Sequence, residues 1–128
     1  MIGELRGGTL LICEGYSTGA TLHEISGLSV IVTFGSGNLR HVVEVVWAAW
    51  PSSKIIICAD DDHLVPNNPG LTSATEAAAM VNAELLIPKF PEGRDRHDTD
   101  FNDLYRVAGK NAVIDCLKGS GGNHVQNL

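Results

Sequence analysis

Three consecutive aspartates, residues 60–62, follow an isoleucine-rich apolar run at residues 54–59. A β-branched run of this kind predicts a strand that is buried on both faces, as in a parallel sheet. In open α/β sheets the carboxyl ends of the strands form the ligand crevice, so acids at that end face a site. Asp60 and Asp62 would point to the same side of an extended segment. Such a pair suits a hard divalent cation, which prefers oxygen ligands, although a solvated turn would also contain aspartates.

A second acid follows a second apolar run. Residues 9–13 (Thr-Leu-Leu-Ile-Cys) predict another buried strand, and Glu14 comes directly after it. If the two strands are neighbours in a sheet they lie about 4.8 Å apart, so that Glu14, Asp60 and Asp62 meet at one edge. Repulsion among three clustered carboxylates raises their pKa values unless a metal ion or protons offset it. We therefore predict a cation site built from these three acids, with Asp61 on the opposite side as a solvated bystander.

The elements that must position these acids alternate between strands and helices. Apolar and β-branched runs predict four strands, at residues 9–13, 28–34, 54–59 and 84–87. Helical spacing of apolar residues, with capping and stop signals, predicts helices from residue 17 or 18 to 26 and over 39–50, 70–82, 100–107 and 111–117. Residues 35–38 are predicted to be a loop. This alternation predicts an α/β fold of about four mainly parallel strands flanked by helices.

The composition indicates the general class of protein, a globular domain. The 128 residues, 44% apolar and 19% charged, fit one soluble globular domain, which we predict over residues 1–118 with a flexible Gly/Asn-rich tail at 119–128. No apolar run approaches the roughly 18 residues that a membrane span needs, and the first residues lack signal-peptide features, so the cytoplasm is the expected location. The net charge of −6 disfavours a stand-alone nucleic-acid binder, but it is compatible with a metal-dependent catalytic module.

Other residues have a structural interpretation. The three cysteines are widely spaced and lack a Cys-x-x-Cys pair, so we expect them to be buried and unbridged. Trp47 and Trp50 are expected to pack between a helix and the sheet. His63 is expected in an exposed loop, and Arg94 in the charged loop 90–99 is expected to be solvated, although either could contact a ligand near the strand ends.

The conjunction of these motifs resembles the Toprim family, the catalytic module of bacterial-type DNA primases, of type IA and type II topoisomerases and of certain nucleases. The resemblance covers roughly residues 8–109. The closest likeness is to plasmid and phage primases and primase-helicases, which share four motifs with this chain. These are Glu-Gly-Tyr-x-Thr-Gly, Ala-Asp-x-Asp, Asn-Pro-Gly and Thr-Asp-Phe-Asn-Asp-Leu, matched here by residues 14–19, 59–62, 68–70 and 99–104.

The resemblance implies roles for five acids. Glu14 would be a general acid/base or a metal-associated carboxylate, and Asp60 and Asp62 would hold Mg²⁺ or Mn²⁺ for phosphodiester formation. Asp100 and Asp103 would be further metal-site acids, although their spacing also fits a helix capping pair. The expected activity is synthesis of short RNA primers from nucleoside triphosphates on single-stranded DNA. The expected partners include zinc-binding or helicase domains of a parent protein.

The chain departs from the primase pattern at two positions, and other functions stay open. Thr18 and Asn102 stand where many primases have acids, which puts a further metal ion in question. One alternative is a metal-dependent nuclease or topoisomerase-like cleavage module that uses the same acids. Another is a non-catalytic module of DNA recombination, which would have no reason to retain Glu14, Asp60 and Asp62 together.

Overall fold

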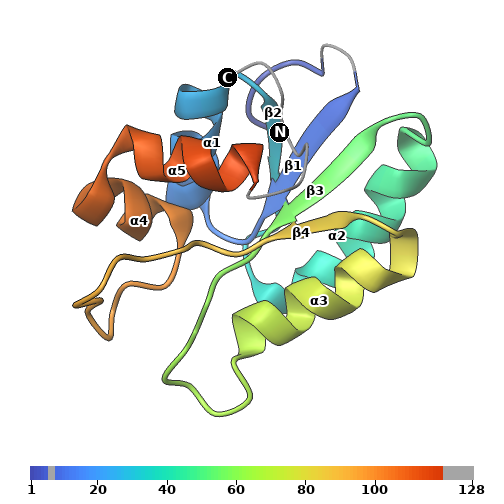
Figure 1. The fold of residues 1–128 in the computed structure, drawn as a ribbon. Helices are drawn as coiled ribbons and strands as arrows, with labels where there is room; N and C mark the ends of the chain where they lie inside the picture. The colour runs from blue at the N-terminus through green and yellow to red at the C-terminus, as the bar shows by residue number, and fades with distance from the viewer. Residues whose placement is uncertain (6–7, 120–128) are drawn as a thin grey trace.

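The computed structural model describes residues 1–5 and 8–119, so the predicted tail, apart from Gly119, lies outside the described residues. The described strands are parallel and form one sheet in the order β2-β1-β3-β4 (Figure 1). The predicted α/β fold with four parallel strands is confirmed. In chain order the elements are β1 (Thr9–Cys13), α1 (Tyr16–Ser26), β2 (Ser29–Val32), α2 (Ser36–Ala49), β3 (Lys54–Cys58), α3 (Pro69–Val81), β4 (Glu84–Leu86), α4 (Phe101–Ala108) and α5 (Lys110–Lys118).

The two strands that precede the acids are neighbours at the centre of the sheet. In the β1–β3 register Thr9 lies opposite Lys54 and Ile12 lies opposite Ile57. Both strands are buried on their two faces, which explains why their sequences are continuous apolar runs rather than alternating ones. The segments that follow β1 and β3 therefore leave the sheet side by side.

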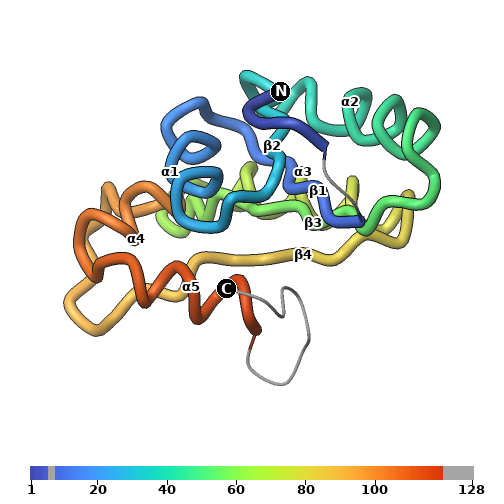
Figure 2. The backbone as a smooth tube through the Cα atoms, turned by 90° about the horizontal axis from the view of Figure 1, so that it is seen from above, coloured from blue at the N-terminus to red at the C-terminus, as the bar shows by residue number. Residues whose placement is uncertain are grey.

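Helices cover both faces of the sheet. In Figure 1, α1, α4 and α5 lie to the upper left of the sheet, and α2 and α3 lie to the lower right. Figure 2 shows the same arrangement from above, with α4 and α5 beside α1. The core on the first face contains Leu11, Leu22, Phe101, Leu104 and Leu117, and the core on the second face contains Leu10, Ile12, Leu39, Val43, Val46, Ala74 and Ala78. The small alanines of α3 allow it to pack closely on the sheet.

Four helices begin one or more residues earlier than predicted, and for α1 and α2 the difference changes how the helix starts. The chain enters α1 at Tyr16 with Gly15 as its N-cap, so neither Ser17 nor Thr18 caps this helix. Similarly, α2 begins at Ser36, inside the segment that was predicted to be a loop. Gly35 has a φ of 136°, which favours glycine, and this backbone lets the chain turn directly from the end of β2 into α2.

The tryptophan prediction is wrong for one of the two residues. Trp50 is partly buried against the second core, as expected. Trp47, in contrast, is 52% exposed, because Leu39, Val43 and Val46 form the face of α2 that meets the sheet. None of the helices in the described residues has the length and apolar character needed to cross a membrane.

The three cysteines are buried and unbridged, as predicted. Burial raises the pKa of the Cys13 thiol to about 12, and the charges of Asp60, Asp100 and Glu14 add to the rise. Burial also raises the pKa of Cys58 and of Cys116. Cys13 therefore stays a neutral thiol, and it lies within the electrostatic reach of three of the predicted site acids.

Candidate active site

Glu14 and Asp60 form the centre of the acidic cluster. Each follows one of the two neighbouring central strands, β1 and β3. Glu14 Oε1 and Asp60 Oδ1 are buried and lack a hydrogen-bond donor. Burial, and then the adjacent Glu14 carboxyl group, raise the pKa of Asp60 to about 9. The charges of Asp100 and Asp62 raise it further, so these acids also lie near Asp60.

This pair needs a positive charge from outside the two side chains. Two ionised carboxylates are both acceptors, so neither can donate a hydrogen bond to the other. A proton on Asp60 removes the repulsion between the two carboxylates, which is why the adjacent Glu14 raises the pKa of Asp60. A divalent cation between the carboxylates would offset the same repulsion. The buried oxygens without donors therefore fit a cation ligand set.

Asp62 is held at the N-terminus of α3. Its Oδ2 accepts a hydrogen bond from the Gly70 amide at 2.9 Å. Its own amide donates to Asn68 Oδ1 at 2.8 Å. The positive end of a helix dipole stabilises a carboxylate in this place. The backbone of α3 thus fixes the orientation of the Asp62 side chain beside Asp60.

The Asn-Pro-Gly motif explains how α3 can approach the acids so closely. Asn68 adopts a left-handed backbone with φ 40°, and its side chain accepts a hydrogen bond from Leu71 N to cap α3. A Cβ atom on Gly70 would lie 2.8 Å from Asp62 Oδ2 and 2.9 Å from the backbone oxygen of Asp60. Such contacts are too short for real side chains. Only glycine at this position lets the N-terminus of α3 approach the acidic loop, which consists of residues 60–62 after β3.

We expect Gly70→Ala to destabilise the domain by about 1–3 kcal/mol, because the new methyl group forces the Asp60–Asp62 backbone away from α3. Urea unfolding measures this change. Gly37→Ala is the matched control, because a Cβ at Gly37 has open space within α2 and alanine is the better helix former. Equal stability of the Gly70→Ala variant and the unsubstituted chain would show that the close approach is not needed.

Asp61 is not the solvated bystander that was predicted. Arg94 Nη1 contacts Asp61 Oδ2 at 2.9 Å, and Arg94 Nη2 donates to the Asp61 backbone oxygen at 2.9 Å. Asn68 Nδ2 donates to Asp61 Oδ1. Burial by itself would raise the pKa of Asp61, but the hydrogen bonds from Asn68 and Arg94 and the charge of Arg94 hold it below its usual value. Asp61 thus anchors the acidic loop instead of facing solvent.

Arg94 was expected to be solvated and is instead a structural link. Besides binding Asp61, its Nε donates to the Asp98 backbone oxygen at 2.8 Å, and its guanidinium lies 4.3 Å from the centre of the Phe90 ring. It therefore ties the segment between β4 and α4 to the acidic loop after β3. No sequence pattern indicates this contact, because Asp61 and Arg94 lie far apart along the chain in irregular segments.

The loop residue His63 is also less exposed than predicted. It is partly buried, and its Nε2 lies in the interior with no hydrogen-bond partner. Its amide donates to the Asp61 backbone oxygen at 2.8 Å, which folds the loop back on itself. The turn brings the ring near Asp61, and the His63 charge helps to lower the pKa of that carboxyl group.

Asp100 and Asp103 form a capping box at the start of α4. The Asp103 amide donates to Asp100 Oδ1 at 2.8 Å, and the Asp100 amide donates to Asp103 Oδ2 at 3.2 Å. The capping interpretation of this pair is confirmed. Asp103 Oδ2 also accepts from Thr99 N, so this oxygen is committed to backbone amides. Asp100 lies nearer the site: burial raises its own pKa, and its charge acts on Asp60.

The two positions that depart from the primase pattern lie on α1 and α4. Thr18 is buried on α1. On the same helix Thr21 Oγ1 donates to Asn102 Oδ1 at 2.8 Å, which ties α4 to α1. The amide of Asn102 thus has a packing role in place of the carboxylate found in many primases.

Residues 1–5 and 8–119 contain no set of three His, Cys, Asp or Glu side chains arranged as a ready-made metal site. The five predicted ligands instead differ in their surroundings, and therefore in how directly they could contact a metal ion. Glu14 and Asp60 have buried oxygens without donors, and Asp62 and Asp100 lie near enough for their charges to act on Asp60. Asp103 caps α4.

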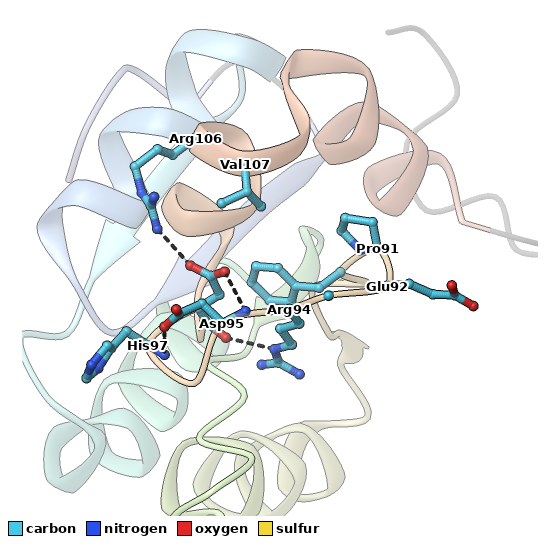
Figure 3. Close-up of a pocket in the computed structure, with 10 residues that line it drawn as sticks. Pro91, Glu92, Arg94, Asp95, His97, Arg106 and Val107 are labelled. Carbon is cyan, nitrogen blue, oxygen red and sulfur yellow. Dashed lines mark hydrogen bonds and ion pairs between the residues drawn. The ribbon is translucent and has the colours of Figure 1, made fainter.

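A separate pocket of about 570 Å³ lies between the segment before α4 and α4 itself. Figure 3 shows Arg106 approaching it from α4 and Arg94 lying in the loop on the other side. Arg106 Nη2 contacts the buried Asp98 Oδ1 at 2.7 Å. Glu14, Asp60 and Asp62 do not line this pocket, so Arg94 is its only direct link to the acidic loop among the described contacts.

A parallel four-stranded α/β domain with paired acids at the ends of its central strands defines the class of this protein. The chain belongs to the Toprim family, because a family model described as "Toprim domain" matches residues 9–111. Two relatives from Escherichia coli, both named DNA primase TraC, are similar to it. One is 39% identical over 92 residues, covering 69% of this chain and 9% of the relative; the other is 38% identical over 95 residues, covering 71% and 7%. The chain thus spans less than a tenth of these relatives.

Proposed function

We propose that this domain is the catalytic Toprim part of a DNA primase, which makes short RNA primers from nucleoside triphosphates on single-stranded DNA. The observation that carries the proposal is the Glu14–Asp60 pair, whose buried oxygens lack donors at the ends of two adjacent strands. The similarity to two DNA primases favours nucleotidyl transfer over strand cleavage. Because this chain spans less than a tenth of those relatives, we also propose that zinc-binding or helicase domains accompany this one in a parent protein.

The residues of the site have distinct roles in this proposal. Glu14, Asp60 and Asp62 would hold Mg²⁺ or Mn²⁺, with Asp100 supplying further negative charge nearby. A bound cation of this kind neutralises charge on a transferred phosphoryl group and assists attack by a 3′-hydroxyl. Glu14 also provides a carboxylate oxygen, Oε1, that is buried and has no hydrogen-bond partner beside Asp60. The N-terminus of α3 orients Asp62, while Asp103 supports the site only through the cap of α4.

The metal site is tested by removing its two aspartates. Asp60→Ala combined with Asp62→Ala is expected to abolish Mn²⁺ binding by the chain, measured by isothermal titration. The matched control is Glu24→Ala with Glu76→Ala, which removes two exposed carboxylates on α1 and α3 and should leave binding unchanged. Equal Mn²⁺ affinity of the unsubstituted chain and the Asp60/Asp62 variant would refute the site.

The reaction is tested in the parent protein. Given single-stranded DNA, nucleoside triphosphates and Mg²⁺, it is expected to make short RNA products, and the same two substitutions should abolish them. Cleavage of the DNA without primer synthesis would favour the nuclease alternative. The isolated chain is expected to polymerise weakly or not at all, and robust primer synthesis by it would contradict that expectation.

A further inference from the structure

Phe34 has a backbone conformation that its side chain disfavours. Its φ is 58°, in the left-handed region. The other non-glycine residues with positive φ in the described part of the chain are Asn67, Asn68 and Asn82, and asparagine tolerates this conformation well. For a bulky aromatic residue the conformation is strained. Strain of this kind persists only where the surrounding structure imposes it, and it concentrates at functional sites.

Hydrogen bonds fix Phe34 directly beside the site. Its amide donates to the Glu14 backbone oxygen at 2.8 Å, and the Thr33 amide donates to the Cys13 backbone oxygen at 2.9 Å. Thr33 Oγ1 donates to the Gly35 oxygen at 3.0 Å, and Asn38 Nδ2 donates to the Thr33 oxygen at 3.1 Å. The turn after β2 is therefore held on both sides, with Phe34 next to the catalytic candidate Glu14.

The Phe34 side chain is 74% exposed, so burial of its ring does not compensate the strain. Tyr16, at the first position of α1 and two residues beyond Glu14, is 62% exposed. Two exposed aromatic residues thus adjoin Glu14, one along the chain and one across the hydrogen bond from Phe34. The carboxyl edge of the sheet combines an acidic centre with flat apolar side chains.

We propose that Phe34 stacks on a nucleobase at this edge, with Tyr16 as a second aromatic contact. The inference rests on the proposed function, since it supplies a nucleobase contact for that site. Aromatic rings stack on any base, and stacking needs no positive charge on the protein. That chemistry suits an edge with a cluster of carboxylates on a chain of net charge −6. The base belongs either to the DNA template or to the incoming nucleotide.

Binding is measured by fluorescence anisotropy in EDTA at about 0.15 M salt, which screens repulsion between the acidic edge and phosphates, with a labelled oligothymidylate and, separately, a fluorescent ATP analogue. Phe34→Ala is expected to weaken binding of one probe roughly tenfold, the loss expected for one stacked base. The affected probe identifies the source of the base. Phe34→Trp should retain affinity. Trp47→Ala, which removes another exposed aromatic side chain on α2, should leave both affinities unchanged.

A Phe34→Gly variant separates binding from folding. Glycine removes the ring and relieves the strain, so probe binding should fall while the Tm rises by a few degrees. A lower Tm would show that the ring packs against the protein and would overturn the proposal. Unchanged affinity of Phe34→Ala for both probes, or no binding of either probe by the unsubstituted chain, would overturn it as well.

The assay in EDTA also separates this inference from the proposed function. The Asp60→Ala/Asp62→Ala variant should still show binding that depends on Phe34, because stacking requires neither metal nor catalysis. If binding depends on Phe34 but the parent protein makes no primers, the stacking inference holds and the proposed function fails. If the parent protein makes primers but Phe34→Ala changes the affinity for neither probe, the proposed function holds and the stacking inference fails.

Discussion

Asp60→Asn is expected to stabilise the domain at pH 8 in the absence of divalent cations. In the native state burial and then Glu14 raise the pKa of Asp60 from 3.8 to about 9, so the folded chain binds more protons than the unfolded chain between these values. The free energy of unfolding therefore falls as pH rises through this range, by up to about 1.4 kcal/mol per pH unit. Asparagine carries no charge and can donate a hydrogen bond to Glu14, so the variant should lose this pH dependence.

Urea unfolding in EDTA at several pH values between 5 and about 9 measures the effect. Asp61→Asn is the matched control with the opposite sign. The pKa of Asp61 is lowered from 3.8, so its charge stabilises the fold throughout this pH range, and Asp61→Asn should destabilise the domain without changing the pH dependence there. Added Mg²⁺ should stabilise the unsubstituted chain but not Asp60→Asn, because only the former offers a complete carboxylate pair. An Asp60→Asn variant less stable than the unsubstituted chain at pH 8 would contradict the account of the site.

Phe101→Ala is expected to lower the free energy of unfolding by about 3–5 kcal/mol. The Phe101 side chain is 0% exposed and belongs to the core between the sheet and the helices α1, α4 and α5. Its loss leaves a cavity under the first turn of α4, directly after Asp100. Because this core holds the α4 cap beside the site, Mn²⁺ binding should weaken along with stability.

Thermal or urea unfolding checks this prediction. Val107→Ala is the control on the same helix, because Val107 is 42% exposed and its truncation should change stability by no more than about 0.5 kcal/mol. A cost below about 1 kcal/mol for Phe101→Ala would mean that the core closes around the missing ring.

The sequence was enough to predict the sheet and the central pair of acids. Continuous apolar runs at residues 9–13 and 54–59 indicated strands buried on both faces, and parallel strands end at one edge. Glu14 and Asp60 therefore met as expected. The Asn-Pro-Gly motif could be matched to primases, but its physical role could not be predicted. That role depends on how closely Gly70 approaches the Asp60 backbone oxygen and the Asp62 Oδ2 atom.

The anchoring contacts could not be predicted. Arg94 and Asp61 lie in segments without a periodic pattern, and no local rule pairs residues that a helix and a strand separate. Phe34 follows a β-branched run and resembles another strand residue, because its left-handed backbone arises from the turn that Gly35 allows into α2. Charge and exposure at these positions depend on tertiary contacts.

The central pairing of β1 with β3 has a consequence for how the chain folds. During synthesis β1, α1, β2 and α2 emerge before β3, so the early chain can pair β1 only with β2. Pairing with β3 is non-local, and non-local pairing is the slow part of folding. Glu14 and Asp60 repel one another and meet only at this step. The repulsion between Glu14 and Asp60 therefore arises only when β1 and β3 pair, and the contacts between these two strands then hold the acids together.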